Sequence, residues 1–279
     1  MGTSRLNRIV SNYTDHPVPY LRSLAQSHAL REDLLAELFH YLDLPAGSRG
    51  MDLGCGCGLP ACELALSRPD LRILGVDISA DLITAARDIA AAAGAEIRFK
   101  TGSAMDAMAE AQNMDWLLSI DCAGYIPELS GNALAGLSRH LKPGGTIALM
   151  AWSSQQLLPG YPMLEARLNT TPEGIAPFTP DMQPEHHFLN TTRALSKAGF
   201  TNVTAKAFTR TLTGPLSEAE EKAVLDLIRM RWGNAYRRDS DVALFKALTD
   251  PESPDYLLGL PTYYGHFTYT LFTAKSASQ

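Results

Sequence analysis

Apolar residues recur at helical spacing in the first part of the chain, between residues 20 and 44. They are Leu21, Leu24, Leu34, Leu35, Leu38, Phe39 and Leu42. This spacing indicates an α-helix with one apolar side, and Pro45-Ala46-Gly47 would end it. We therefore expect a helical segment ahead of the first strand.

The pattern then changes to short apolar runs that alternate with helical stretches. Strands are expected at residues 50–53, 71–76, 96–99, 116–120 and 146–150, and helices at 59–66, 79–94 and 129–141. Ser79 suits the N-cap of the second of these helices, and Gly94 suits its C-terminal end. Strands that alternate with helices predict right-handed crossovers and an α/β fold with a doubly wound parallel sheet. A ligand would then bind beyond the carboxyl ends of the strands.

The alternation stops after residue 152 and resumes with a helix near 188–198, a strand at 200–208 and a closing strand at 263–274. Between these elements lie two stretches that read as insertions, the second with a helix from Ser217 to Trp232. We therefore divide the chain into three parts. These are an N-terminal helical cap (1–44), a core (45–152, 188–213 and 262–279) and inserted lid segments (153–187 and 214–261).

Composition and charge narrow the class of protein. Of 279 residues, 46% are hydrophobic and 19% charged, as in ordinary globular proteins. The formal net charge of −6 and the lack of a dense Lys/Arg cluster argue against a nucleic-acid partner. No apolar stretch approaches the roughly 20 residues that span a bilayer, and the N-terminus lacks a signal-peptide core. The four cysteines do not form the framework of a disulfide-rich secreted protein, so we expect a cytoplasmic location.

A glycine loop follows the first expected strand. Its spacing is Gly54-x-Gly56-x-Gly58, one residue shorter than the G-x-G-x-x-G loop that cradles a dinucleotide pyrophosphate. The strand ends in an acid, Asp52, which would repel a pyrophosphate and attract an ammonium group. The loop therefore favours a ligand with an amino-acid portion.

Polar residues follow the next three strands as well. Asp77 ends the second strand, where a carboxylate can accept hydrogen bonds from ribose hydroxyls. Ser103, with Ala104 and Met105, follows the third strand and could contact an adenine edge. Asp121 follows the fourth strand. Together these positions predict a nucleoside pocket.

In combination, these motifs resemble those of the class I S-adenosylmethionine-dependent methyltransferases. Residues 51–58 look like the family's first motif, 75–79 like its acidic second-strand motif and 141–145 like the turn before strand five. Ala198-Gly199-Phe200 resembles the entry to strand six. The resemblance covers roughly residues 45–152 and 188–209, plus the final strand. It implies a Rossmann-like, seven-stranded, mostly parallel sheet whose last strand is antiparallel.

The resemblance also implies roles for individual residues toward S-adenosylmethionine, which would leave as S-adenosylhomocysteine. Gly54, Cys55 and Gly56 would contact its methionine portion, and Asp52 would orient the amino group. Asp77 would bind the ribose, while Ile78 would pack on the adenine. Ser103, Ala104 and Met105 would line the adenine edge, Asp121 would lie near the methionine end, and Tyr13 of the cap would cover the cofactor. Many family members carry Asp where this chain has Ser103.

Several residues could serve as a general base if the acceptor must lose a proton. The candidates are Asp121, Tyr125, His16 and His186. Aromatic side chains are also expected at the pocket, because aromatic faces stabilise a sulfonium cation. These are Tyr20 in the cap, and Tyr125 and Trp152 facing the acceptor.

The cluster of Cys55, Cys57 and Cys62 is interpreted as small side chains in a crowded loop. A thiolate metal site is the alternative, but no matching set of His or Cys ligands follows. We therefore expect no metal.

The sequence thus predicts an enzyme that transfers a methyl group from S-adenosylmethionine to a small, partly apolar organic acceptor bound by the two insertions. Two alternatives stay open. One is an NAD(P)-dependent oxidoreductase, and the other is a non-catalytic S-adenosylmethionine-binding protein. The acceptor, the accepting atom and the oligomeric state have no sequence signature.

Overall fold

The described residues form one seven-stranded sheet in the order β3-β2-β1-β4-β5-β7-β6. A computed structural model describes residues 3–110, 113–122, 132–175, 179, 181–235 and 238–277. The strands are β1 (Arg49–Leu53), β2 (Arg72–Asp77), β3 (Ile97–Thr101), β4 (Met114–Ile120), β5 (Leu141–Gln156), β6 (Thr201–Thr213) and β7 (Tyr264–Lys275). β7 runs antiparallel to both of its neighbours, while β1 to β5 pair in parallel. The predicted fold is confirmed.

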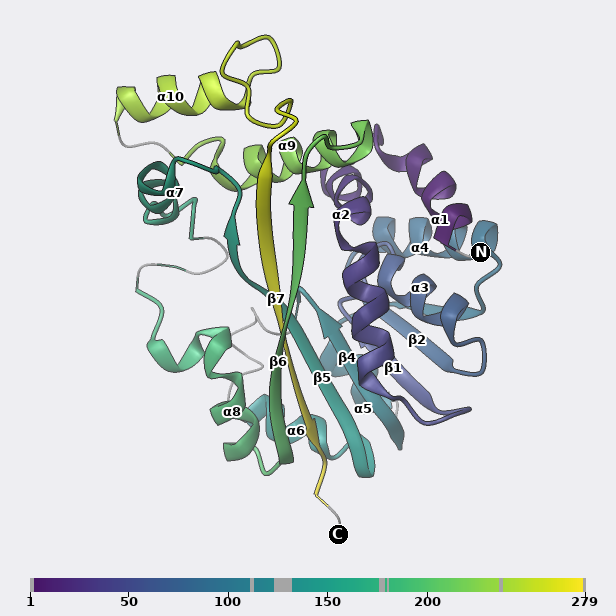
Figure 1. The fold of residues 1–279 in the computed structure, drawn as a ribbon. Helices are drawn as coiled ribbons and strands as arrows, with labels where there is room; N and C mark the ends of the chain where they lie inside the picture. The colour runs from purple at the N-terminus through teal and green to yellow at the C-terminus, as the bar shows by residue number, and fades with distance from the viewer. Residues whose placement is uncertain are drawn as a thin grey trace.

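Helices cover both faces of this sheet (Figure 1). One face carries α2 (Pro19–Leu42), α3 (Leu59–Ser67) and α4 (Ala80–Ala93), and the other carries α5 (Ala104–Glu110), α6 (Asn132–Ser138) and α8 (Thr191–Lys197). β4 shows how the two cores arise, because Trp116 and Leu118 point to the first face and Leu117 to the second. Because its apolar side chains point to both faces, this buried strand contributes to two layers at once.

The remaining helices lie at the N-terminus and in or next to the two predicted insertions. They are α1 (Thr3–Val10), α7 (Pro162–Asn169), α9 (Glu218–Trp232), α10 (Asp239–Thr249) and short 3-10 turns at Ser11–Tyr13, Pro184–His186 and Phe188–Asn190. Figure 1 shows α7, α9 and α10 together at one end of the sheet, where the long strands β6 and β7 extend. No helix in the described part of the chain is both long and apolar enough to cross a membrane.

Local chemistry explains where several elements begin and end. Ser79 accepts a hydrogen bond from the Leu82 amide at 3.3 Å and caps α4, whose C-terminal residue Gly94 is left-handed. Ser217 and Glu220 form a capping box at the start of α9. The predicted boundaries of both helices are confirmed to within a residue or two.

β5 is much longer than the predicted run at 146–150. It continues to Gln156 because β7 pairs with it as far as the Gln156–His266 register. The start of the predicted insertion at 153–187 is therefore sheet. Part of the predicted helix at 129–141 lies outside the described residues, and α6 covers Asn132–Ser138.

Candidate functional site

The loop between β1 and α3 is built on glycines with a left-handed backbone. The φ angles of Gly54, Gly56 and Gly58 are 73°, 56° and 74°, which glycine adopts without steric cost. The Gly54 amide donates a hydrogen bond to the Val76 carbonyl at 2.8 Å. A Cβ atom on Gly54 would lie 2.2 Å from Cys122 Sγ. The loop therefore packs directly against the ends of β2 and β4.

Asp77, the last residue of β2, stabilises this loop by hydrogen bonding. Its Oδ2 accepts a hydrogen bond from the Gly56 amide at 2.9 Å, and its Oδ1 accepts one from the Ser79 amide at 2.9 Å. Each carboxylate oxygen has a second acceptor position. Asp77 can therefore hold the loop and still accept hydrogen bonds from a ligand's hydroxyl groups.

Asp52 lies beneath the loop in β1 and is only 2% exposed. Its Oδ2 has no hydrogen-bond partner among the residues that the structure describes. Burial, with a smaller contribution from the Asp77 carboxylate, raises the pKa of Asp52 to about 7. A cationic ligand group beside Asp52 would relieve the cost of this buried carboxylate.

A cavity of about 550 Å³ opens beyond the carboxyl ends of these strands. Six of the predicted site residues line it, namely Asp52, Gly54, Cys55, Gly56, Asp77 and Asp121. Two of the aromatic residues expected at the pocket, Tyr20 and Trp152, line it too. The topology thus brings together side chains from β1, β2, β4, β5 and the N-terminal cap.

Asp121 is held by three groups from distant parts of the chain. Its Oδ1 accepts a hydrogen bond from the Trp152 amide at 3.2 Å, and its Oδ2 accepts one from the Tyr269 hydroxyl at 2.7 Å. The Arg31 guanidinium lies 3.4 Å from the same Oδ2. Asp121 also has a left-handed backbone, with φ 53°. These contacts fix an acidic side chain where β4, β5, β7 and α2 meet.

Two helices form the upper wall of the cavity. α2 contributes Tyr20, Ser23, Leu24, Gln26, Ser27, Leu30 and Arg31, and α9 contributes Ala223, Asp226, Leu227, Met230 and Arg231. In each set, residues or adjacent pairs recur every three to four positions, so each set occupies one side of its helix. Sequence reasoning missed Arg31 and the α9 residues, although this spacing is a signal that could have been used for both helices.

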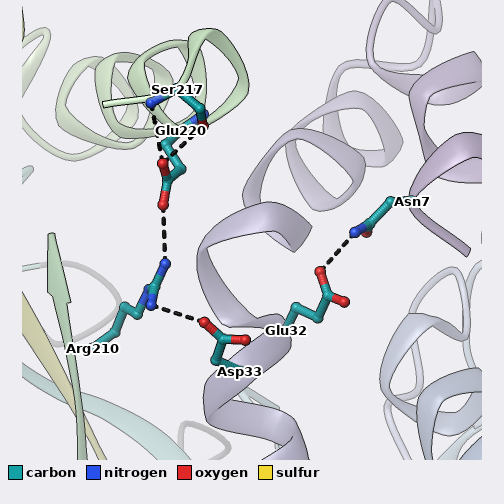
Figure 2. Close-up of polar contacts among 6 residues, drawn as sticks. All are labelled: Asn7, Glu32, Asp33, Arg210, Ser217 and Glu220. Atoms are coloured by element: carbon teal, nitrogen blue, oxygen red, sulfur yellow. Dashed lines mark hydrogen bonds and ion pairs between the residues drawn. The ribbon is translucent and has the colours of Figure 1, made fainter. Parts of the chain in front are cut away.

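Polar contacts outside the cavity tie α2 to its neighbours (Figure 2). Arg210 of β6 donates from Nη1 to Asp33 Oδ2 at 2.8 Å and from Nη2 to Glu220 Oε1 at 3.0 Å. It thereby links α2 to the start of α9. On the other side of α2, the Asn7 amide donates to Glu32 Oε2 at 2.7 Å.

The residues predicted for the adenine lie outside the lining of this cavity. Ile78, directly after β2, is 78% exposed, and Met105, in the first turn of α5, is 44% exposed. Ser103 accepts a hydrogen bond from the Asp106 amide at 3.1 Å and donates one to its carboxylate at 2.8 Å, and Ala104 begins α5. Ser103 therefore has a structural role at the start of α5, and the predicted adenine contacts stay predictions.

The structure also places the cap residues and candidate bases. His16 accepts a hydrogen bond from the Val18 amide through Nδ1 at 3.2 Å, and its ring stacks on Tyr13 at 6.0 Å. Neither residue lines the cavity. His186 is exposed in a 3-10 turn, and Tyr125 lies outside the described residues. Of the four candidate bases, Asp121 alone is seen at the cavity.

The loop cysteines are poor candidates for metal ligands. All four cysteines are free, and burial raises the pKa of the Cys57 thiol to about 11 and of the Cys62 thiol to about 12. The pKa of Cys55 is raised as well, for the same reason. In the described ranges, no three His, Cys, Asp or Glu side chains gather as a metal site.

Residues 51–145, which run from β1 into β5 and contain the glycine loop and Asp77, match a family model described as a methyltransferase domain. This part of the chain is therefore similar to a methyltransferase domain. The fold of the chain resembles that of a candidate methyltransferase from Bacillus halodurans, with a TM-score of 0.55 over 88% of this chain and 99% of that one. At 16% identity, this likeness shows the fold alone.

The chain is also similar to curated enzymes. It is 29% identical over 120 residues to methyltransferase GfsG of Streptomyces halstedii, across 42% of this chain and 42% of that protein. It is 31% identical over 104 residues to the ubiquinone biosynthesis O-methyltransferase of Methylococcus capsulatus, across 37% of this chain and 42% of that protein. The chain therefore spans less than half the length of these relatives.

Proposed function

We propose that this protein transfers a methyl group from S-adenosylmethionine to a small organic acceptor. The observation that carries the proposal is the buried Asp52 carboxylate beneath the glycine loop, with one oxygen unpartnered among the described side chains and backbone. An ammonium group is the complement to such a carboxylate, whereas a pyrophosphate would be repelled. The nicotinamide alternative is therefore not favoured.

The residues present fit the methyl donor. Asp52 would bind its ammonium group, and the Gly54–Gly56 backbone would pack along its methionine portion. Asp77 would accept hydrogen bonds from the ribose hydroxyls. Ile78 and Met105, exposed beside this edge, would flank the adenine. The donor supplies a methyl group on a sulfonium, already activated for displacement.

The chain's own contribution would be positioning and exclusion of water. In-line displacement at a methyl group needs the acceptor atom held in line with the leaving sulfur, and proximity supplies much of the rate. α2 and α9 close one side of the cavity, so the acceptor would be held between them and the strand ends. Asp121 is the residue best placed to take a proton from an acceptor.

The aromatic and apolar residues that line the cavity favour a partly apolar acceptor. The Trp152 ring stacks on Phe267 with centroids 4.6 Å apart, and the Arg231 guanidinium lies 6.0 Å from the Trp152 centroid. Leu227 and Met230 face the same space from α9. We therefore assign α9, within the second insertion, to acceptor binding. The name of the ubiquinone-pathway relative is consistent with a small-molecule acceptor.

Two further parts of the proposal rest on charge and cysteine chemistry. The net charge of −6 disfavours a nucleic-acid substrate. Four free cysteines suit a reducing compartment, so the protein would act in the cytoplasm. The division into cap, core and acceptor-binding insertions belongs to the same proposal.

Calorimetric titration tests the proposed methyl donor. S-adenosylmethionine and S-adenosylhomocysteine should bind, and NAD should not. Tight binding of NAD without binding of S-adenosylmethionine would overturn the proposal.

A screen of phenols, carboxylic acids and amines, followed by S-adenosylhomocysteine formation, tests the acceptor class. A methylated small molecule is the expected product. Methylation of protein or RNA alone would contradict the proposed acceptor, and cofactor binding without any transfer would favour a non-catalytic protein.

A further inference from the structure

Arg31 is a buried cation that lines the cavity. It comes from α2, is only 9% exposed, and shares the cavity wall with Asp52, Gly54 and Cys57. Arginine stays charged when it is buried, so its guanidinium needs an anion or several acceptors nearby. The position of Arg31 in the fold therefore raises the question of what neutralises it.

The described contacts neutralise Arg31 incompletely. Its Nη1 lies 3.4 Å from Asp121 Oδ2, which is a long contact, and its Nε–H has no hydrogen-bond acceptor within the described chain. Asp121 is shared, because it also accepts hydrogen bonds from Tyr269 and the Trp152 amide. A guanidinium has five N–H donors, so Arg31 retains capacity for a further anion.

The other buried titratable groups near Arg31 add little negative charge. His28 follows the same side of α2, and burial, with the Arg31 charge, lowers its pKa to about 4. Glu63 of α3 lies 3.3 Å from His28, and burial raises the pKa of Glu63 to about 8. Both are therefore uncharged near neutral pH.

Two of the incompletely satisfied groups that line the cavity carry opposite charge, the Asp52 carboxylate and the Arg31 guanidinium; the Asp226 carboxylate of α9 is another. A ligand that carries both an ammonium and a carboxylate matches this pair, and arginine is the side chain best suited to a carboxylate. We propose that Arg31 binds the carboxylate of the donor's methionine portion while Asp52 binds its ammonium group. This inference rests on the proposed function and assigns the recognition of the donor's amino-acid end partly to the N-terminal helix.

A ligand with the amino-acid portion and one without it separate this role from a merely structural one. S-adenosylhomocysteine has the carboxylate, and methylthioadenosine lacks the whole amino-acid portion. Calorimetry should show that Arg31→Met weakens S-adenosylhomocysteine binding by about 10- to 100-fold, the range for losing a charge-assisted hydrogen bond, and leaves methylthioadenosine binding unchanged. Arg31→Lys, which keeps the charge without the planar fork, should show an intermediate loss.

Arg210→Met is the matched control. Arg210 also ties α2 to the sheet, but it does not line the cavity. This variant should bind both ligands as the wild type does, which shows that loosening α2 is not enough to lower affinity.

Three outcomes would overturn the assignment of Arg31 and leave the proposed function standing. If Arg31→Met loses the same affinity for both ligands, Arg31 has a structural role. If it loses affinity for neither, another group binds the donor's carboxylate. Arg31→Met could also keep the wild-type affinity for S-adenosylhomocysteine and show a raised KM for an acceptor acid. Arg31 would then bind the acceptor and not the donor. Failure of the wild type to bind S-adenosylhomocysteine would instead overturn the proposed function and this inference together.

Discussion

The Tyr269 hydroxyl donates a hydrogen bond to Asp121 Oδ2 at 2.7 Å, although the two residues are 148 positions apart in the chain. Tyr269 belongs to the antiparallel strand β7, and Asp121 follows the parallel strand β4. β5 lies between these strands and contributes the Trp152 amide to the same carboxylate. The last strand of the sheet thus helps to fix an acidic group in the lining of the cavity.

Replacing Tyr269 by Phe removes this hydrogen bond and keeps the ring. We expect a loss of about 1–2 kcal/mol in the free energy of unfolding, because a partly buried carboxylate loses a donor. S-adenosylhomocysteine affinity should fall several-fold, since Asp121 would be less well held. Tyr256→Phe is the control, because Tyr256 donates to Glu221 at 2.9 Å outside the cavity lining. A similar loss of ligand affinity in both variants would contradict a specific role for Tyr269.

Asp52→Asn should make the free energy of unfolding less dependent on pH. The pKa of Asp52 rises from 3.8 to about 7 on folding, so the folded protein holds a proton that the unfolded chain releases between about pH 4 and 7. The wild type without ligand therefore loses stability as pH rises through this window. In Asp52→Asn this loss should be smaller by about 2–4 kcal/mol, measured by denaturant unfolding at both ends of the window. Glu63 is present in both proteins, so its own contribution cancels; parallel pH curves would contradict the buried, ionisable Asp52.

Ligand affinity should depend on pH in the opposite direction. The ammonium group of S-adenosylhomocysteine pairs with ionised Asp52, so binding below the pKa of about 7 must release a proton. Affinity should therefore fall as pH drops, toward about tenfold per unit. Calorimetry in two buffers with different ionisation enthalpies measures the proton release at about pH 6. Proton uptake on binding, or a release that persists in Asp52→Asn, would contradict this pairing.

The sequence predicts the core of the sheet well because its strands are buried on both faces. Runs such as Trp116–Ile120 are apolar except for Ser119, so they can be recognised in the sequence without knowing their partner strands. The second half of β5 was missed for the converse reason. Residues 153–156 are polar, and they extend the strand because β7, more than 100 residues later in the chain, pairs with them.

The residues of the candidate site also fall into those that the sequence predicts and those that it does not. The loop residues Asp52, Gly54 and Asp77 are predictable, because local backbone geometry and strand ends determine their positions. Arg31 and Tyr269 come to the cavity through the packing of α2 and the pairing of β7, neither of which a local pattern encodes. The sequence predicts their hydrogen-bonding partner Asp121, but not the groups that hold it.

Gly47 and Gly54 share a left-handed backbone, but only Gly54 lies in the glycine loop after β1. Comparing alanine substitutions at the two positions therefore separates the cost of backbone strain from the cost of steric crowding. Gly47 and Gly54 have φ angles of 67° and 73°, but a Cβ on Gly47 would meet nothing within 4 Å, whereas one on Gly54 would meet Cys122. Gly47→Ala should cost about 1 kcal/mol of stability through backbone strain. Gly54→Ala should cost about 1–3 kcal/mol more, from overpacking, and should weaken S-adenosylhomocysteine binding. Adding Cys122→Gly to Gly54→Ala should recover the steric part in a double-mutant cycle; equal losses for the two single alanine variants would show that the loop does not pack on Cys122.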